Sequence, residues 1–217
     1  MRLKPSDALC GLAILVVAAL AAYLYPAISD PMPTHFNAEG AVDGYSRKSW
    51  GVLLVVAAPL FVFLVFKALP LISPRGFQMD AFQAVTDILS VTVTMAAAGI
   101  GVAVLLRASG KNVPLMVVLP MVVGATFVVV GNYLGKLRKN FFVGIRTPWT
   151  LASDEVWVRT HRFGGWLFAL AGLVILSSAG YPGRFPTVLI SATVTVSIIA
   201  VAYSFVLYRK LHGFSDG

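Results

Sequence analysis

The sequence predicts an all-α polytopic membrane protein, with about six transmembrane helices and a structured cytoplasmic loop between the fourth and the fifth. Hydrophobic residues make up 58% of the 217 residues and charged residues only 12%, whereas soluble domains are about half apolar and a quarter charged. The mean hydropathy is +0.84. The apolar residues also fall into runs of about 20, the length that crosses the hydrocarbon core as a helix. No stretch therefore remains for a soluble domain.

The expected membrane spans follow one another with short connections. They lie near residues 8–27, 50–69, 83–106, 114–133, 163–180 and 187–208. The fifth span is the shortest, and it contains Gly164, Gly165 and Gly172. Such small residues let two helices approach closely in a membrane. We expect an N-terminal membrane region at 1–110, with spans one to three, and a C-terminal one at 111–217, with spans four to six.

The N-terminus combines basic residues with the first apolar run. Arg2 and Lys4 before this run could be mistaken for a secretory signal, but the five later spans favour a first transmembrane helix. Cys10 is the single cysteine, so an internal disulfide and a Cys-rich metal site are excluded. We expect no cofactor.

The basic residues are distributed unequally between the two sides of the predicted bundle. Twelve of the seventeen Lys and Arg fall in the N-terminal tail, the loop around Arg75 (with Lys67), the loop after span four and the C-terminal tail. The remaining five are Arg47, Lys48, Arg107, Lys111 and Arg184. The positive-inside rule then places both termini on the cytoplasmic side. The net charge of +8 is dispersed among loops, so we expect contact with membrane lipids and no direct nucleic-acid partner.

The loop at 132–165, called the signature loop below, carries six of the Lys and Arg residues. Lys136, Arg138, Lys139 and Arg146 lie within eleven residues, and Arg forks suit bidentate capture of a carboxylate or phosphate. The alternative is contact with anionic headgroups, worth about 1 kcal/mol per charge. Other polar residues favour a specific anion site, because lipid attraction needs only charge. They are Asn132, Tyr133, Asn140, Thr147 and Trp149.

The local structure of the signature loop can also be predicted. Ser153, followed by Asp154 and Glu155, is typical of a helix N-cap and an acidic first turn. We expect a short helix from there to about His161, with Trp157 at the membrane interface. Pro148 disfavours helix at the residue before it, so residues 140–150 are expected to be ordered but irregular.

The same loop resembles the C-terminal signature of the SdpI family of bacterial membrane immunity proteins. The resemblance rests on Asn132-Tyr133, Gly135-Lys136, Arg138 and the run from Asn140 to Thr150. A second motif, Pro33-Thr34-His35-Phe36-Asn37 with Gly40 and Asp43-Gly44, is similar to one found upstream in many members of that family. Together the two motifs anchor nearly the whole chain.

The resemblance implies a function in the bacterial cell membrane. SdpI-like proteins protect bacteria against a secreted, membrane-active peptide toxin, and the founding member also holds a transcriptional repressor at the membrane. By this resemblance the outward loop at Pro33, His35, Asn37 and Gly40 would sense the toxin. An acidic repressor would dock on the basic cytoplasmic loop, beside Trp149 and Trp157.

Asp87 lies about one turn inside the third span, where a carboxylate is costly unless it is paired. Because this span begins on the cytoplasmic side, we expect Asp87 to pair with Arg146 or Arg138. Ser90 and Thr94 continue the same helical stripe and indicate a polar seam inside the bundle. The alternative is that these hydroxyls bond their own helix and Asp87 lies at the interface.

Two histidines invite a chemical interpretation. His35, Glu39 and Asp43 are spaced by four residues, but zinc needs three or four well-placed ligands, so we expect a turn at Asn37 and Gly40 and no metal. His161 and Arg162 could relay protons or bind headgroups, but a polar helix end is the favoured interpretation.

No catalytic motif is present in the sequence, so we do not expect an enzyme. Two alternatives to immunity remain open. One is a small membrane transporter or channel. The other is an enzyme acting on a phosphorylated lipid, with Lys136, Arg138, Arg146 and His161 around the phosphate.

Overall fold

The computed structural model describes residues 4–74, 79 and 82–213. Within this part of the chain, six helices are long and apolar enough to cross a membrane, which confirms the predicted fold class. They are α1 Pro5–Leu24, α2 Lys48–Ala68, α3 Gln83–Ala108, α4 Leu115–Leu134, α6 Asp154–Ser177 and α7 Phe185–His212. The shorter elements are η1 Tyr25–Ala27, β1 Met32–Phe36, β2 Val42–Ser46, α5 Pro148–Ala152, η3 Ser178–Gly180 and η4 Pro182–Arg184. Arg2 and Arg75, two of the residues counted for the orientation, lie outside the described residues.

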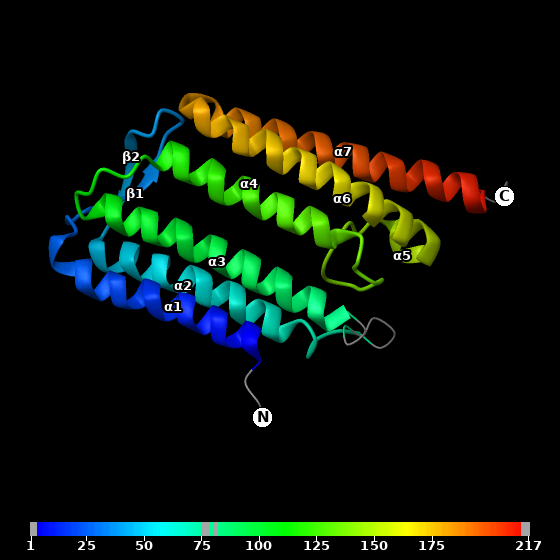
Figure 1. The fold of residues 1–217 in the computed structure, drawn as a ribbon, viewed down its shortest axis with the longest axis horizontal. Coiled ribbons are helices and arrows are strands. Elements are labelled where there is room, and N and C mark those ends of the chain that lie inside the picture. Colours follow the sequence, from blue (N-terminus) through cyan, green and yellow to red (C-terminus); the bar gives the residue numbers. More distant parts are fainter. Residues whose placement is uncertain (1–3, 75–78, 80–81, 214–217) are drawn as a thin grey trace.

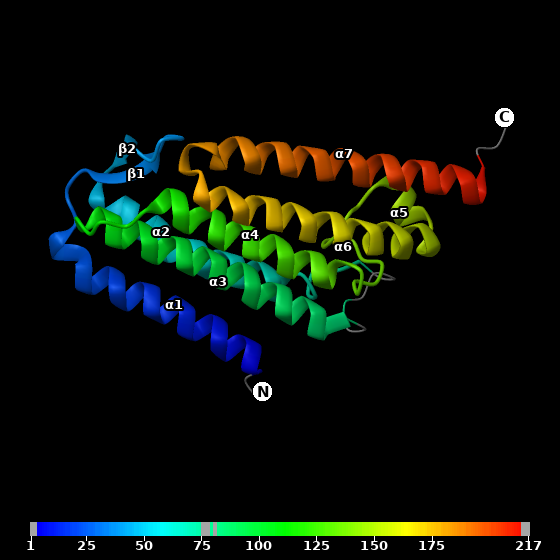
Figure 2. The ribbon, with the colours of Figure 1, turned by 45° about the horizontal axis from the view of Figure 1, so that its top comes forward.

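The long helices pack as two groups of three. Helices α1, α2 and α3 contact one another, α6 packs on both α4 and α7, and α3 joins the groups by packing on α4. Figure 1 shows the first group below the second, with all six helices running along the long axis of the molecule. In the turned view α1 and α7 lie at opposite edges (Figure 2). The proposed boundary near residue 110 falls in the connection between α3 and α4, and it stays a prediction.

The fifth span differs from its predicted boundaries. Ser153 does cap a helix, since its hydroxyl accepts a hydrogen bond from the amide of Val156 at 3.4 Å. The short helix to about His161 is wrong, however, because α6 continues without a break to Ser177. Residues 154–163 contain no Gly or Pro that would end the helix. The helix therefore reaches beyond the last turn of α4.

The loop after α1 forms a small antiparallel β-hairpin, which the sequence did not predict. Met32 pairs with Ser46 and Phe36 with Val42, with irregular register between these pairs. The predicted turn at Asn37 and Gly40 is confirmed: the Asn37 Oδ1 atom accepts from the amides of Glu39 (3.1 Å) and Ala41 (2.8 Å), and Gly40 has a φ of 80°.

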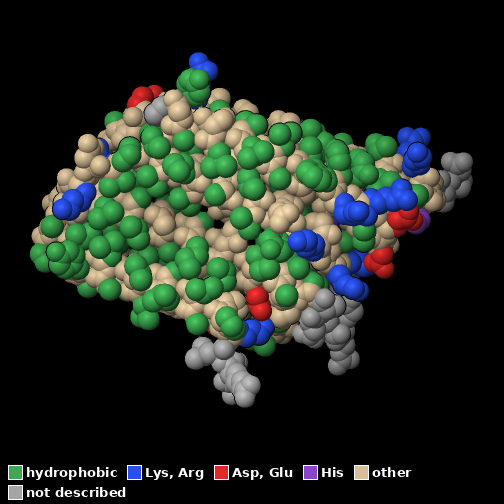
Figure 3. All heavy atoms as spheres, in the orientation of Figure 1, with side chains coloured by type: hydrophobic (Ala, Val, Ile, Leu, Met, Phe, Trp, Pro, Cys, Tyr) green, Lys and Arg blue, Asp and Glu red, His purple; other side chains and the backbone are tan. Residues whose placement is uncertain are grey.

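Charge is concentrated at the two ends of the bundle. Figure 3 shows a face whose middle is widely hydrophobic and a group of Lys and Arg side chains near α5. The hairpin lies at the opposite end from α5 (Figure 1). This separation is what a bilayer-spanning bundle requires, because charged groups are expensive in the hydrocarbon core.

Candidate functional site

The signature loop connects α4 to α6 at the end of the bundle that also carries both described ends of the chain (Figure 1). Its polar residues fall into two sets. One set points inward and holds the loop together, and the other leaves positive charge on the surface.

Asn140 is the centre of the inward set. Its side chain is fully buried and makes four hydrogen bonds within the loop. The Nδ2 atom donates to the carbonyls of Arg138 (3.0 Å) and Val143 (2.9 Å), and Oδ1 accepts from the amides of Phe142 (2.9 Å) and Val143 (2.7 Å). All four bonding positions of this side-chain amide are thus used. Asn140 shapes the loop and is not available to a ligand.

Thr147 fixes the next part of the loop. Its hydroxyl accepts from the amide of Thr150 at 3.1 Å, and the Thr150 hydroxyl accepts from the amide of Thr147 at 2.9 Å, so the pair caps α5. The Thr147 hydroxyl also lies 3.0 Å from the Ser204 hydroxyl of α7. Trp149 packs edge-on against Phe205 of the same helix, with ring centroids 5.0 Å apart. The loop is therefore attached to the last membrane helix.

His161 and Trp157 attach the loop to α6. Both side chains have no exposed surface, and their rings stack with centroids 3.9 Å apart. The His161 Nδ1 atom donates to the Trp157 carbonyl (2.8 Å), and Nε2 accepts from the Ile145 amide (2.9 Å). The Trp157 indole donates to the Leu137 carbonyl at 2.9 Å. The predicted positions of Trp157 and His161 at the membrane interface are thus wrong, because both side chains are buried inside the protein. The imidazole of His161 must be neutral, because one ring nitrogen donates a hydrogen bond and the other accepts one.

Gly144 explains why the chain can pass so close to His161. It has a φ of 118°, in the region that favours glycine. A Cβ atom at this position would collide with the imidazole ring of His161. The turn in the signature therefore depends on a missing side chain.

The basic residues divide according to their partners. Lys139 pairs with Asp154, Arg159 pairs with Glu155 at 2.6 Å, and the Arg146 guanidinium donates to the Phe141 carbonyl at 2.9 Å. Lys136, Arg138 and Arg162 are exposed and have no carboxylate partner among the described residues. Of the cations predicted to bind an anion, Lys136 and Arg138 keep that capacity, whereas Lys139 is already neutralised.

Helices α4 and α6 approach through two pairs of glycines. A Cβ on Gly131 would lie 2.6 Å from the Gly165 carbonyl oxygen, and one on Gly124 would lie 2.7 Å from that of Gly172. The expectation that span five packs closely through small residues is confirmed at Gly165 and Gly172. Such contacts bring two backbones together and leave room beside them.

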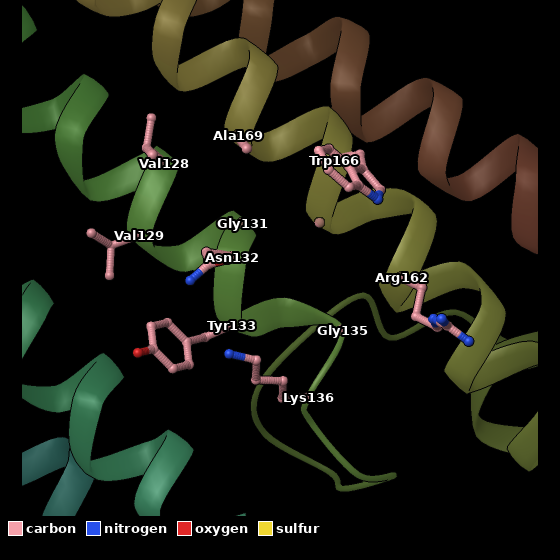
Figure 4. A pocket seen from close by; sticks show the side chains of 11 residues that line it. Val128, Val129, Gly131, Asn132, Tyr133, Gly135, Lys136, Arg162, Trp166 and Ala169 are labelled. Carbon is pink, nitrogen blue, oxygen red and sulfur yellow. The ribbon is translucent and has the colours of Figure 1, made fainter.

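A groove of about 480 Å³ lies next to this contact. It is lined by Val128, Val129, Gly131, Asn132, Tyr133, Gly135, Lys136, Arg162, Gly165, Trp166 and Ala169. Figure 4 shows α4 on one side and α6 on the other, with Val128 and Ala169 toward one end and Lys136 and Arg162 toward the other. Asn132, Tyr133, Lys136 and Arg162 were predicted as site residues, and the groove brings them together. Trp166 was missed, because one exposed Trp in a span has no distinctive local pattern.

Asp87 has partners other than those predicted. Its carboxylate accepts from the Lys4 ammonium at 3.1 Å and from the Gln83 side-chain amide at 3.0 Å, so the pairing with Arg138 or Arg146 is wrong. Lys4 directly precedes α1, and the packing of α1 on α3 brings it to Asp87.

The polar seam beyond Asp87 is partly formed. Ser90 is buried beside a small cavity of about 40 Å³ that the ion pair of Asp7 and Lys67, 2.7 Å long, also lines. The Thr94 hydroxyl is buried and has no hydrogen-bond partner in the described structure. Asp7 and Lys67 were missed, although both are charged residues near span ends, at the same end of the bundle as Asp87.

The motif around His35 forms part of the hairpin. The His35 Nδ1 atom lies 2.6 Å from the Asp43 carboxylate, and both side chains are well exposed. Gly44 faces His35 across the hairpin, where a Cβ would lie 2.7 Å from the His35 Cβ. In the described part of the chain, no three His, Cys, Asp or Glu residues are grouped for a metal ion. Pro33 pairs with Tyr45 in the strand register.

Comparison with known proteins places these observations in a family context. Residues 136–208 match the SdpI/YfhL protein family, and residues 12–58 match a domain of unknown function, DUF1648. The chain is 22% identical over 191 residues to the immunity protein SdpI of Bacillus subtilis (strain 168), covering 88% of this chain and 89% of that protein. No solved structure matches. The resemblance to the SdpI family is confirmed, and the matched segment contains both Thr147 and its partner Ser204.

Proposed function

We propose that this SdpI-family membrane protein confers resistance to a secreted antimicrobial peptide toxin in the bacterial cell membrane, with both termini in the cytoplasm. The observation that carries the proposal is the similarity to an immunity protein over 88% of the chain. It extends well beyond the signature loop, so the whole membrane bundle is related and not one motif alone.

The geometry of the bundle supports different functions for its two ends. The hairpin with His35 and Asp43 lies at the outward end in the proposed orientation, where a secreted peptide would meet it. The signature loop lies at the cytoplasmic end, and its inward bonds make it a stable platform. Arg138 projects from that platform without a carboxylate partner in the described structure.

In this proposal an acidic repressor docks on the same platform. The docking surface differs from the predicted one, because Trp157 is fully buried and Trp149 packs on Phe205. Arg138 and Lys136 would carry the attraction to an acidic partner, as unpaired charges do at interface rims.

The two alternative functions gain less support from the geometry. A lipid-modifying enzyme would need His161 as general acid or base, but both ring nitrogens already bond to Trp157 and Ile145. A transporter would need a polar path at mid-membrane, whereas the stripe at Asp87 adjoins a cavity of about 40 Å³.

The proposal can be tested by expression in a sensitive bacterium. Cells would carry the parent protein, Arg138→Gln or the matched control Arg209→Gln, which removes the same charge from the exposed end of α7. Membrane levels would be equalised, and survival would be measured against a panel of secreted, membrane-active peptides. We expect protection by the parent and the control and reduced protection by Arg138→Gln. Survival of the parent strain no better than the empty vector across the panel would contradict the proposal.

A further inference from the structure

The groove between α4 and α6 is amphipathic along its length. Val128, Val129 and Ala169 line one end, and Asn132, Lys136 and Arg162 line the other (Figure 4). Trp166 stands at the wall on α6 with 80% of its surface exposed. An occupant that fits both ends must itself be apolar at one end and anionic at the other.

The polar end lies at the depth of lipid headgroups. Helix α4 ends at Leu134, and Lys136 follows two residues later. Arg162 is level with this point, since a Cβ on Gly135 would lie 3.3 Å from the Arg162 Cα. The two cations therefore flank the groove just beyond the last apolar turn of α4, where a bilayer changes from hydrocarbon to headgroups.

The charge at this end is not neutralised by the protein. The Lys136 ammonium lies 4.2 Å from the centre of the Tyr133 ring, and no carboxylate among the described residues pairs with it or with Arg162. The acidic residues at the start of α6 are already used, because Asp154 pairs with Lys139 and Glu155 with Arg159. An anion is the missing partner.

We propose that this groove binds an anionic phospholipid from the cytoplasmic leaflet. Lys136 and Arg162 hold the headgroup phosphate, and the Asn132 amide is placed to donate to it. One acyl chain lies against Val128 and Ala169 beside Trp166. From Val128 to the end of α4 at Leu134 the helix rises about 9 Å, which accommodates the first part of an acyl chain. Neither a free phosphate nor an acidic peptide would use the apolar end.

Binding can be measured on the full-length protein in a neutral detergent, independently of any immunity assay. The probes are phosphatidylglycerol and phosphatidylcholine with identical brominated acyl chains, which quench the fluorescence of a nearby indole. The Trp166→Phe variant identifies the contribution of Trp166. We expect phosphatidylglycerol to bind about thirty-fold more tightly than phosphatidylcholine, since two surface cations together supply a preference of this order.

The charge variants provide the decisive comparison. Lys136→Gln with Arg162→Gln should abolish most of the preference, whereas the matched pair Arg209→Gln with Lys210→Gln should keep it. Both pairs are exposed and change the net charge equally, and circular dichroism checks that each variant folds. Equal affinity for the two lipids, or equal loss in both double variants, would overturn the proposal. Displacement of the lipid by inorganic phosphate or by polyglutamate at the same charge concentration would also overturn it, in favour of a soluble anion or an acidic protein.

Discussion

Asn140→Ala should open the signature loop while leaving the membrane helices in place. The substitution removes all four hydrogen bonds of a fully buried side chain and leaves two amides and two carbonyls without their partner. Each unsatisfied buried group costs about 1–3 kcal/mol. Water will reach some of these groups once the loop rearranges, so we expect the loop to lose about 3 kcal/mol of local stability.

The loss of local stability can be measured by proteolysis, because the loop contains trypsin cleavage sites. We expect trypsin to cleave after Arg138, Lys139 and Arg146 when the loop opens, because a protease binds an extended segment, and the cleavage rate then follows the open population. A loss of about 3 kcal/mol corresponds to roughly a hundred-fold faster cleavage. Global unfolding can be followed separately by a thiol-reactive dye, because the single cysteine, Cys10, is buried in α1.

Asn132→Ala is the matched control. It removes the same side chain from the same signature, but Asn132 is exposed and makes no hydrogen bond with the described residues. Its cleavage rate should equal that of the parent. If Asn140→Ala were cleaved no faster than Asn132→Ala, the four hydrogen bonds would not stabilise the loop. Asn140 would then again be a candidate for binding a ligand.

Three further outcomes are expected. Gly131→Leu should reduce the free energy of unfolding by about 1–3 kcal/mol or more, seen as a lower midpoint in the dye assay, because its Cβ would meet the backbone of α6 at 2.5 Å. Asp87→Lys should destabilise modestly, by up to about 1 kcal/mol, and Lys4→Asp should restore the midpoint in the double variant. Cysteines introduced at Lys111 and Arg138 should react with a membrane-impermeant maleimide in intact cells at the first position only.

Each of these outcomes has a control. Gly180→Leu inserts the same side chain where a Cβ would meet nothing within 4 Å, so an equal effect there would exclude tight α4–α6 packing as the cause. If Arg146→Asp restored the unfolding midpoint of the Asp87→Lys variant, the partner of Asp87 would be Arg146 of the signature loop and not Lys4. Labelling at position 138 in intact cells would reverse the proposed orientation, and buried Cys10 gives a low background for this experiment.

The helices were predictable because each needs only a local pattern of about 20 apolar residues. The start of α6 was predicted too late, because residues 154–162 are helical but not uniformly apolar. One side of this segment is polar, and the other is buried at Val156, Trp157, Thr160 and His161. The hairpin was missed because its strands contain Pro33 and Gly44, which sequence rules exclude from ordinary strands. Its turn at Asn37 was found, since that turn depends only on adjacent residues.

The partners of polar groups were far less predictable. Several cations were expected on the same side of the membrane as Asp87, and sequence gives no means to choose among them. Lys4 is 83 residues away along the chain, so only the packing of α1 on α3 selects it. The presence of a cation partner at this end of the bundle was therefore predictable, whereas the individual pairs depended on the tertiary structure.

The two sets of signature residues must be tested by different experiments. Asn140, Thr147 and His161 use their polar groups in hydrogen bonds within the loop and to neighbouring helices. Their substitution therefore changes the conformation of the whole loop surface. Lys136 and Arg138 make no carboxylate contact among the described residues, so their substitution mainly changes what can bind, with the loss of one contact between Lys136 and the Tyr133 ring. Loss of resistance in the first set would measure the stability of the platform. Loss in the second set, with trypsin resistance of the remaining loop sites unchanged, would identify an anionic partner.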